Sequence, residues 1–362
     1  MAIYPNKLDP RTLIDISGTL DEMTKQYGRF NHSGLFNKQG ITTQDFGFMY
    51  TPAEQTKMTG ATSRLERDAW KISKEKKKRA TLSGTQYKLT DAVQYEDLAF
   101  RVNDWQALNP QARETTVAEA VSEKLGLMQR TMEQNQEYSV FTAMQGIQKD
   151  AEDGSDLINM YTTLGVIRLT ANVDLTATTG VIASITALTN QLMEAQTYGS
   201  GFTGIEVVVA DDVFDKLVTH PEIIAIYEAA MTGRGMEYVN SPWLTGRVND
   251  LNRSLYGFVR TVVINGVTFT TYSQKFKRWD GTLVNALESG KGFTVLQGVQ
   301  GLYSAKFSPA PYISLLGSVG QENYVWQTPI KDDTHFEIYH ESHGMYFMQQ
   351  PELSVDITFK LA

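Results

Sequence analysis

The longest regular pattern of apolar and polar positions lies near the middle of the first half of the chain. Apolar residues recur at steps of three and four positions, at Val117, Val121, Leu125, Met128 and Met132. This spacing places the side chains on one face of an α-helix. The pattern therefore predicts a single long helix over 116–145, with one apolar stripe.

The ends and the polar face of this helix have their own signals. Thr116 with Glu119 three residues later is typical of a capping box, and Gly146 predicts the end. On a helical wheel the opposite face carries the acidic stripe, which comprises Glu119, Glu123, Glu133 and Glu137. We expect this stripe to be exposed.

The second half of the chain alternates between strand and helix patterns. The β-branched run Ile205–Ala210 predicts a strand buried on both faces, and Asp211 or Asp212 is expected to cap the following helix. Asn265–Gly266 predicts a tight hairpin because both residues accept positive φ angles. Further patterns predict a strand at 166–174, a helix at 180–198, a strand at 290–296 and a half-buried final strand at 353–361.

The segment from residue 28 to about residue 110 has few apolar runs that could form a core. A compact domain seldom tolerates so long a stretch without its own core, so we expect an extended arm followed by a hairpin-like excursion. A short amphipathic helix is predicted before it, over 11–27. Arms of this kind reach other subunits.

Bulk composition limits the possible functions. The 362 residues are 41% hydrophobic, enough for a large core and more consistent with two lobes than with one. The net charge of −8 argues against nucleic-acid binding over the whole chain. The absence of cysteine excludes disulfides and thiolate metal sites. With no signal-peptide pattern and no apolar run of membrane-spanning length, we expect a soluble protein made inside the cell.

Candidate chemistry is sparse. The chain has no nucleophile-elbow motif and no Walker loop. The ligand-like cluster His335, His340 and His343, with Glu337 and Glu341, is one residue short of the zinc-binding HExxH spacing, and we expect it to form a polar surface strand and turn. We therefore predict no catalytic, metal or cofactor site.

A basic run is the strongest electrostatic feature of the sequence. It comprises Lys71, Lys74, Lys76, Lys77, Lys78 and Arg79, with Glu75 as its only acid. Nucleic-acid binding, simple solvation and pairing with carboxylates of another copy are all open. In an acidic chain we favour pairing between copies as the inter-subunit role.

The order of these parts resembles the major capsid proteins of tailed bacteriophages, which have the Hong Kong 97 fold, and is most similar to the lambda-type branch. The stretch Ile205–Ile223 is similar to the strand, acidic residue, aromatic and His-Pro pattern of the axial domain in that family. Gly301-Leu302-Tyr303, Pro309-Ala310 and the alternating C-terminal strand are similar to its second half. The resemblance implies an α+β fold with an N-terminal arm (1–39), an extended loop (40–100), a peripheral domain (101–179) with a spine helix (114–147), an axial domain (180–325), and returning strands of the peripheral domain (326–362).

The resemblance also implies a function. Copies would assemble as pentamers and hexamers into an icosahedral head shell that encloses double-stranded DNA without sequence-specific binding, with the acidic stripe facing the lumen. No enzyme activity, cofactor or membrane is implied. Portal, scaffold and decoration proteins are expected partners, and the site of assembly is the host cytoplasm, with the protein ending in the virion. The alternatives are an encapsulin-type nanocompartment shell, another virion component and an unrelated enzyme.

Overall fold

The computed structural model describes residues 29–50, 78–99, 110–195, 201–225, 252–254, 257–328 and 335–361. They form two compact units. The first comprises the described residues of Met1–Phe46, Leu82–Val140 and Ser304–Tyr346. The second comprises those of Gly47–Thr81, Phe141–Tyr303 and Phe347–Ala362. The predicted helix over 11–27 and residues 71–77 of the basic run lie outside the described residues.

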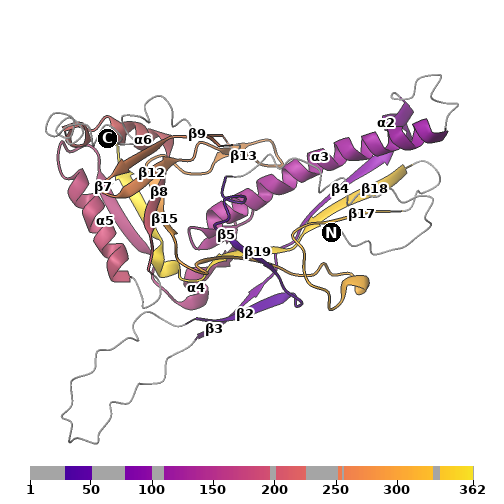
Figure 1. The fold of residues 1–362 in the computed structure, drawn as a ribbon, viewed down its shortest axis with the longest axis horizontal. Helices are drawn as coiled ribbons and strands as arrows, with labels where there is room; N and C mark the ends of the chain where they lie inside the picture. The colour runs from indigo at the N-terminus through magenta and orange to yellow at the C-terminus, as the bar shows by residue number, and fades with distance from the viewer. Residues whose placement is uncertain are drawn as a thin grey trace, which may run out of the picture. The chain divides into compact units, whose positions relative to one another are not determined.

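The first unit is built on the long helix α3 (Pro110–Ala143), whose last turn belongs to the second unit. An antiparallel sheet of order β17-β18-β4 packs against it (Figure 1). The strands are β17 (Tyr324–Gln327), β18 (His335–Ser342) and β4 (Tyr87–Gln94), and the short helix α2 (Tyr95–Ala99) follows β4. Their shared core comprises Val93, Ala120, Val121, Leu125, Met128, Val325, Phe336 and Ile338. The predicted apolar stripe of the helix is thus confirmed as its core face.

A second sheet in this part of the chain has the order β1-β16-β19. Its strands are β1 (Asn37–Gly40), β16 (Tyr303–Phe307) and β19 (Gly344–Met348). β1 runs parallel to β16, so a segment near the N-terminus pairs with one from the last fifth of the chain. A loop with one 3₁₀ turn, η3 (Ile313–Leu315), leads from β16 to β17.

The second unit contains a six-stranded sheet of order β11-β12-β8-β15-β20-β7. The strands are β11 (Thr261–Ile264), β12 (Val267–Thr271), β8 (Gly204–Val209), β15 (Lys291–Gln297), β20 (Val355–Lys360) and β7 (Leu169–Asp174). β20, the last strand of the chain, lies inside the sheet between antiparallel β15 and parallel β7. Helices α5 (Val181–Ala195) and α6 (Asp211–Val218) flank this sheet (Figure 1).

The remaining described elements are short. Two-stranded sheets form from β2 (Asp45–Tyr50) with β3 (Lys78–Ser83), β5 (Ile147–Lys149) with β6 (Asp156–Asn159), β9 (Asn252–Ser254) with β10 (Gly257–Val259), and β13 (Lys275–Lys277) with β14 (Leu283–Asn285). α4 (Met160–Leu164) lies between β6 and β7, a helical turn over 221–225 follows α6, and η4 (Pro351–Leu353) lies between β19 and β20. No helix in the described ranges is long and apolar enough to cross a membrane.

Most local predictions are confirmed. β8 is buried along nearly its whole length, as its β-branched run indicated. Asn265 and Gly266 join β11 to β12 with φ angles of 50° and 77°, the left-handed conformation that the hairpin requires. The final strand alternates buried and more exposed positions as predicted.

Three predictions about element ends and pairing are wrong. The long helix begins at Pro110, because proline fits the first helical position, and the Thr116–Glu119 pattern lies inside it. The N-cap of α6 is Ala210 with no side-chain bond, so neither Asp211 nor Asp212 caps it. β4 is not part of an excursion, since it pairs along its whole length with β18.

The two units also group the chain differently from the predicted segments. β5, β6, α4 and β7, expected with the spine helix, fall in the second unit. Residues 326–362 are divided, because β18 belongs to the first unit while β20 belongs to the six-stranded sheet of the second.

Candidate functional site

The acidic stripe of α3 is divided by its surroundings. Glu119 and Glu123 are exposed, but Glu133 and Glu137 are 2% and 0% exposed. The prediction of one continuous exposed stripe is therefore wrong for the second pair. The helical wheel separates the polar face from the apolar stripe, but it does not show that other segments of the first unit cover the polar face near the helix end.

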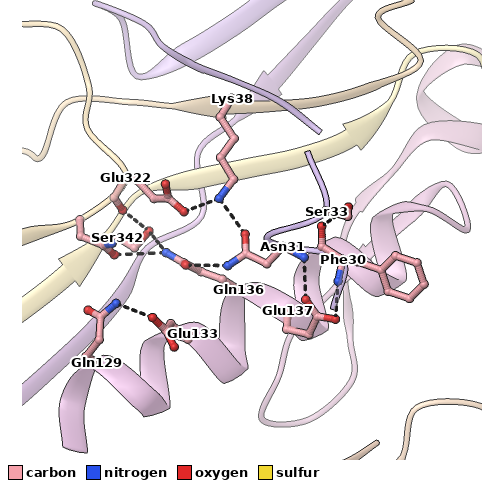
Figure 2. Close-up of polar contacts among 11 residues, drawn as sticks. Phe30, Asn31, Ser33, Lys38, Gln129, Glu133, Gln136, Glu137, Glu322 and Ser342 are labelled. Carbon is pink, nitrogen blue, oxygen red and sulfur yellow. Dashed lines mark hydrogen bonds and ion pairs between the residues drawn. The ribbon is translucent and has the colours of Figure 1, made fainter. Parts of the chain in front are cut away.

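Glu137 holds the described segment nearest the N-terminus. Its Oε1 accepts a hydrogen bond of 3.0 Å from the backbone N–H of Phe30, and its Oε2 accepts one of 2.7 Å from that of Asn31 (Figure 2). Hydrogen bonds to an ionised carboxylate are stronger than those between neutral groups. Both oxygens of a buried carboxylate thus fix two successive peptide groups on the side of the helix.

Gln136, the neighbour of Glu137, extends the contact to the sheet. Asn31 Nδ2 donates to Gln136 Oε1 at 3.3 Å, and Gln136 Nε2 donates at 3.2 Å to Ser342 Oγ at the end of β18. The Ser342 hydroxyl in turn donates to the Glu322 carbonyl at 2.7 Å (Figure 2). One amide side chain therefore joins the N-terminal segment, the helix and β18.

Lys38 on β1 provides the partly exposed contacts of this cluster. Its Nζ donates to Asn31 Oδ1 at 2.8 Å and forms an ion pair of 2.6 Å with Glu322 (Figure 2). We call Asn31, Lys38, Gln136, Glu137, Glu322 and Ser342 the helix anchor. It fixes residues 30–38 against the helix and the loop before β17.

A second polar cluster lies on β18, centred on the fully buried Glu341. Its carboxylate accepts a hydrogen bond of 2.5 Å from the Tyr312 hydroxyl, pairs with Lys88 at 2.8 Å and lies 3.4 Å from His343 Nε2. Burial raises the pKa of Glu341, but the hydrogen bonds from His343, Lys88 and Tyr312 outweigh burial and lower its pKa to about 2. The cluster holds β4, β18 and the loop after β16 together.

The predicted histidine cluster is not a surface feature. His340, Glu341 and His343 are all buried. His340 shares the face of β18 that carries the core residues Phe336 and Ile338, and the loop after β16 contacts Glu341 through Tyr312. Neither ring nitrogen of His340 has a hydrogen-bond partner, and burial lowers its pKa to about 4, only partly opposed by Glu341. No group of three potential metal ligands occurs in the described part of the chain.

Only the last two residues of the basic run, Lys78 and Arg79, lie in the described part of the chain. Lys78 and Arg79 lie exposed on β3, and Lys78 Nζ donates to the Leu164 carbonyl at 2.7 Å. This contact within the chain gives Lys78 a structural role of its own. Lys71, Lys74, Lys76 and Lys77 lie outside the described residues.

Sequence reasoning missed most of the helix anchor. Asn31, Lys38 and Glu322 are separated from Glu137 by about a hundred residues or more, and no local pattern joins them. One signal for the helix anchor was present in the sequence, the polar pair Gln136–Glu137 near the end of the amphipathic helix. The same pair is equally typical of a helix face exposed to solvent.

Comparisons with known proteins identify the family. Residues 12–359 match the family model described as phage major capsid protein E. The major capsid protein of Salmonella phage Felix O1 (isolate Felix O1-VT1) is 24% identical over 362 residues, which cover 95% of each chain. The crystal structure of a putative capsid protein from a prophage of E. coli CFT073 matches with a TM-score of 0.57 at 13% identity, covering 99% of both chains.

The last comparison shows a shared fold, and the Hong Kong 97-type α+β fold implied by the sequence resemblance is confirmed. The family is a structural capsid family rather than an enzyme family. The chain belongs to the phage major capsid protein E family and is a virion component, the major capsid protein that forms the icosahedral head shell of a tailed phage.

Proposed function

We propose that the chain builds this shell through many modest contacts between copies in rings of five and six, and that it uses no catalytic site. The observation that carries the proposal is the family match over residues 12–359. Each segment laid across a neighbour adds buried area at about 25 cal/mol per Å², less the cost of ordering it. Repetition around a closed shell multiplies such small gains.

The two units supply the parts for these contacts. We assign the first unit, with α3 and its sheet, as the peripheral domain and the six-stranded second unit as the axial domain. Residues before the helix anchor form the arm, and the segment carried by the β2–β3 pair forms the extended loop. The helix anchor supports this assignment, because hydrogen bonds to the buried Glu137 carboxylate fix Phe30 and Asn31, which would be the base of the arm.

The basic run and the exposed glutamates of α3 have different roles. The basic run pairs with carboxylates of neighbouring copies, and the exposed Glu119 and Glu123 face the packaged DNA, where like charge keeps DNA from adhering to the wall. Glu133 and Glu137 have no part in this, since they are buried in the first unit. The enclosed DNA is not read by sequence.

The remaining partners follow from the role of a phage shell. We propose a portal protein, a scaffold and a decoration protein as partners, and assembly in the host cytoplasm. An encapsulin shell was the nearest alternative from the sequence, and the match to a phage capsid family together with a phage relative favours the phage shell.

Negative-stain microscopy of the purified protein tests the proposal. Shells tens of nanometres wide are expected, whereas uniform monomers with enzymatic turnover would contradict it. A Lys76→Glu/Lys77→Glu variant should impair shell formation while leaving the subunit folded. Lys78 is left unchanged because it bonds Leu164 within the chain. The matched control is Lys76→Arg/Lys77→Arg, which keeps the charge and should assemble; normal shells from the glutamate variant would reject the role of the basic run.

A further inference from the structure

One loop of the first unit presents apolar side chains to solvent. The connection from β16 to β17 spans residues 308–323, and we call its part Ser308–Gly320 the apolar loop; Glu322, which follows it, is paired with Lys38 in the helix anchor. Ile313 is 97% exposed, Leu316 is 90% exposed and Val319 is 59% exposed. Scattered single apolar residues are ordinary on a protein surface, but three within seven positions of one loop form a patch that calls for an explanation.

The local backbone places the Ile313 and Leu316 side chains on the same side of the loop. Ile313 and Leu316 are three residues apart across the 3₁₀ turn η3, and side chains at that spacing eclipse one another on the same side. Leu315 points the other way, 2% exposed, and packs with Ala310 and Tyr324. Leu315 thus packs the turn against the first unit, while Ile313 and Leu316 are exposed to solvent.

The base of the apolar loop is firmly held. The Tyr312 hydroxyl bonds the buried Glu341 carboxylate, and the Tyr312 ring packs edge-on against Trp326 at a centroid distance of 5.7 Å. At the other end the Gly320 N–H donates to the Ile41 carbonyl at 2.8 Å. A Cβ on Gly320 would lie 2.0 Å from the Phe307 carbonyl oxygen, so the backbones pass too closely for any side chain there. The exposed residues therefore sit on a preorganised support, and binding through them costs little ordering entropy.

The apolar loop is also uncharged. Its sequence, SPAPYISLLGSVG, contains no Lys, Arg, Asp or Glu, although such residues make up 20% of the chain. Identical surfaces that meet around a rotation axis bring each residue close to its own copies, so an unbalanced charge there would repel itself. An uncharged apolar surface meets this requirement directly.

Trp279 provides a contrast. It is 86% exposed at the turn between β13 and β14, but Lys277, Arg278 and Asp280 surround it in sequence. That turn has a net positive charge, so two copies of it would repel each other, whereas an acidic partner would suit it. The apolar loop and this turn thus differ in the type of partner that their chemistry accepts.

We propose that the apolar loop is a self-association surface, in which the Ile313 and Leu316 side chains of one copy contact the same loop of neighbouring copies around a rotation axis of the shell. The proposal rests on the proposed shell function and adds which surface meets its own kind. The partner is a second copy of this chain.

The absence of cysteine gives a direct test. In Ile313→Cys and Leu316→Cys variants every thiol is at the loop, so any disulfide or short bis-maleimide bridge between chains joins loop to loop. We expect covalent dimers on a non-reducing gel from assembled shells of both variants. Ile167→Cys is the matched control, because Ile167 is 85% exposed but lies in the second unit, and it should remain monomeric on the gel. Shells of both loop variants without bridged chains would overturn the proposal.

Charge at the same positions provides a second measurement. Leu316→Glu should reduce the yield of shells at least tenfold, whereas Leu316→Met should assemble like the parent, with circular dichroism confirming that both subunits fold. Wild-type yield from Leu316→Glu would contradict self-association of the loop while leaving the shell function intact. If the parent chain itself forms no shells, the proposed function fails instead, so the two failures are distinguishable.

Discussion

In the first half of α3, Glu119 and Glu123 are exposed, whereas in the second half Glu133 and Glu137 are buried. All four glutamates share one face of the same helix. The difference lies in the segments that face them. Residues 30–31 cover the second half and donate two backbone N–H groups to the Glu137 carboxylate, while Ser342 at the end of β18 accepts a hydrogen bond from the neighbouring Gln136. The second half thus stabilises the subunit, and the exposed first half remains available for contacts outside the chain.

Removing the buried carboxylate should have the largest effect. Glu137→Ala leaves the N–H groups of Phe30 and Asn31 without this acceptor in a buried site, and we expect a loss of about 3 kcal/mol in the free energy of unfolding. Glu123→Ala is the matched control at an exposed position and should change it by less than about 0.5 kcal/mol. Urea titration of unassembled subunits measures both. Equal losses from the two variants would remove the distinction between the helix halves.

Acid should destabilise the folded subunit through the buried His340. His340 lies between Ile338 and Ser342 on the face of β18 that carries core residues, and its pKa of about 4 lies below the ordinary value of about 6.5. Between these values the unfolded chain binds a proton that the folded chain does not, so stability falls as pH drops from about 6.5 to 4, by about 3 kcal/mol in all.

The measurement is the free energy of unfolding across that pH range, compared with a His340→Leu variant. The variant should lose the part of the slope above pH 4.5 that His340 causes, because the adjacent Glu341, with a pKa of about 2, is still ionised there in the folded state. His335→Asn, at the partly exposed start of the same strand, controls for the loss of a histidine. An unchanged slope in His340→Leu would assign the acid sensitivity to other groups.

Lys38 tests the outer edge of the helix anchor. Its ion pair with Glu322 is partly exposed, with both side chains more than a quarter accessible, so Lys38→Met should cost about 1 kcal/mol or less. The loss should shrink further in high salt, because salt screens exposed pairs. A loss as large as that of Glu137→Ala would mean that the edge, and not the buried carboxylate, dominates the helix anchor.

The smallest effect on folding is expected at the exposed pair. Glu119→Lys/Glu123→Lys should change the free energy of unfolding by less than about 0.5 kcal/mol. Its consequence should appear only in shells, which would retain nucleic acid through the new positive charges if these residues face the lumen. Cryo-electron microscopy that places both residues on the outer surface would end this role.

Local signals predicted much of the fold. The Asn265–Gly266 hairpin, the buried strand β8 and the core face of α3 each depend on residues close in sequence, where conformational preference and periodicity decide the outcome. The resemblance to tailed-phage capsid proteins rested on the order of these elements, and it identified the fold and the family correctly.

Pairings between distant segments could not be predicted in the same way. His340 and Glu341 are polar and suggested a surface, but one face of β18 packs with α3 in the shared core, and Tyr312 of the loop after β16 bonds Glu341. Glu137 suggested solvent, but Phe30 and Asn31, more than a hundred positions earlier, cover it. A single sequence shows which face of an element is polar; it does not show which other polar groups will be placed against that face.

The position of β20 has a consequence for the timing of synthesis. This strand is made long after β7, yet it separates β15 from β7 in the six-stranded sheet, and β7 pairs with no other strand there. Nascent chains that lack Val355–Lys360 therefore hold β7 without its neighbour. A polypeptide that stops before β20 therefore leaves the six-stranded sheet divided and cannot supply a finished subunit to a growing particle.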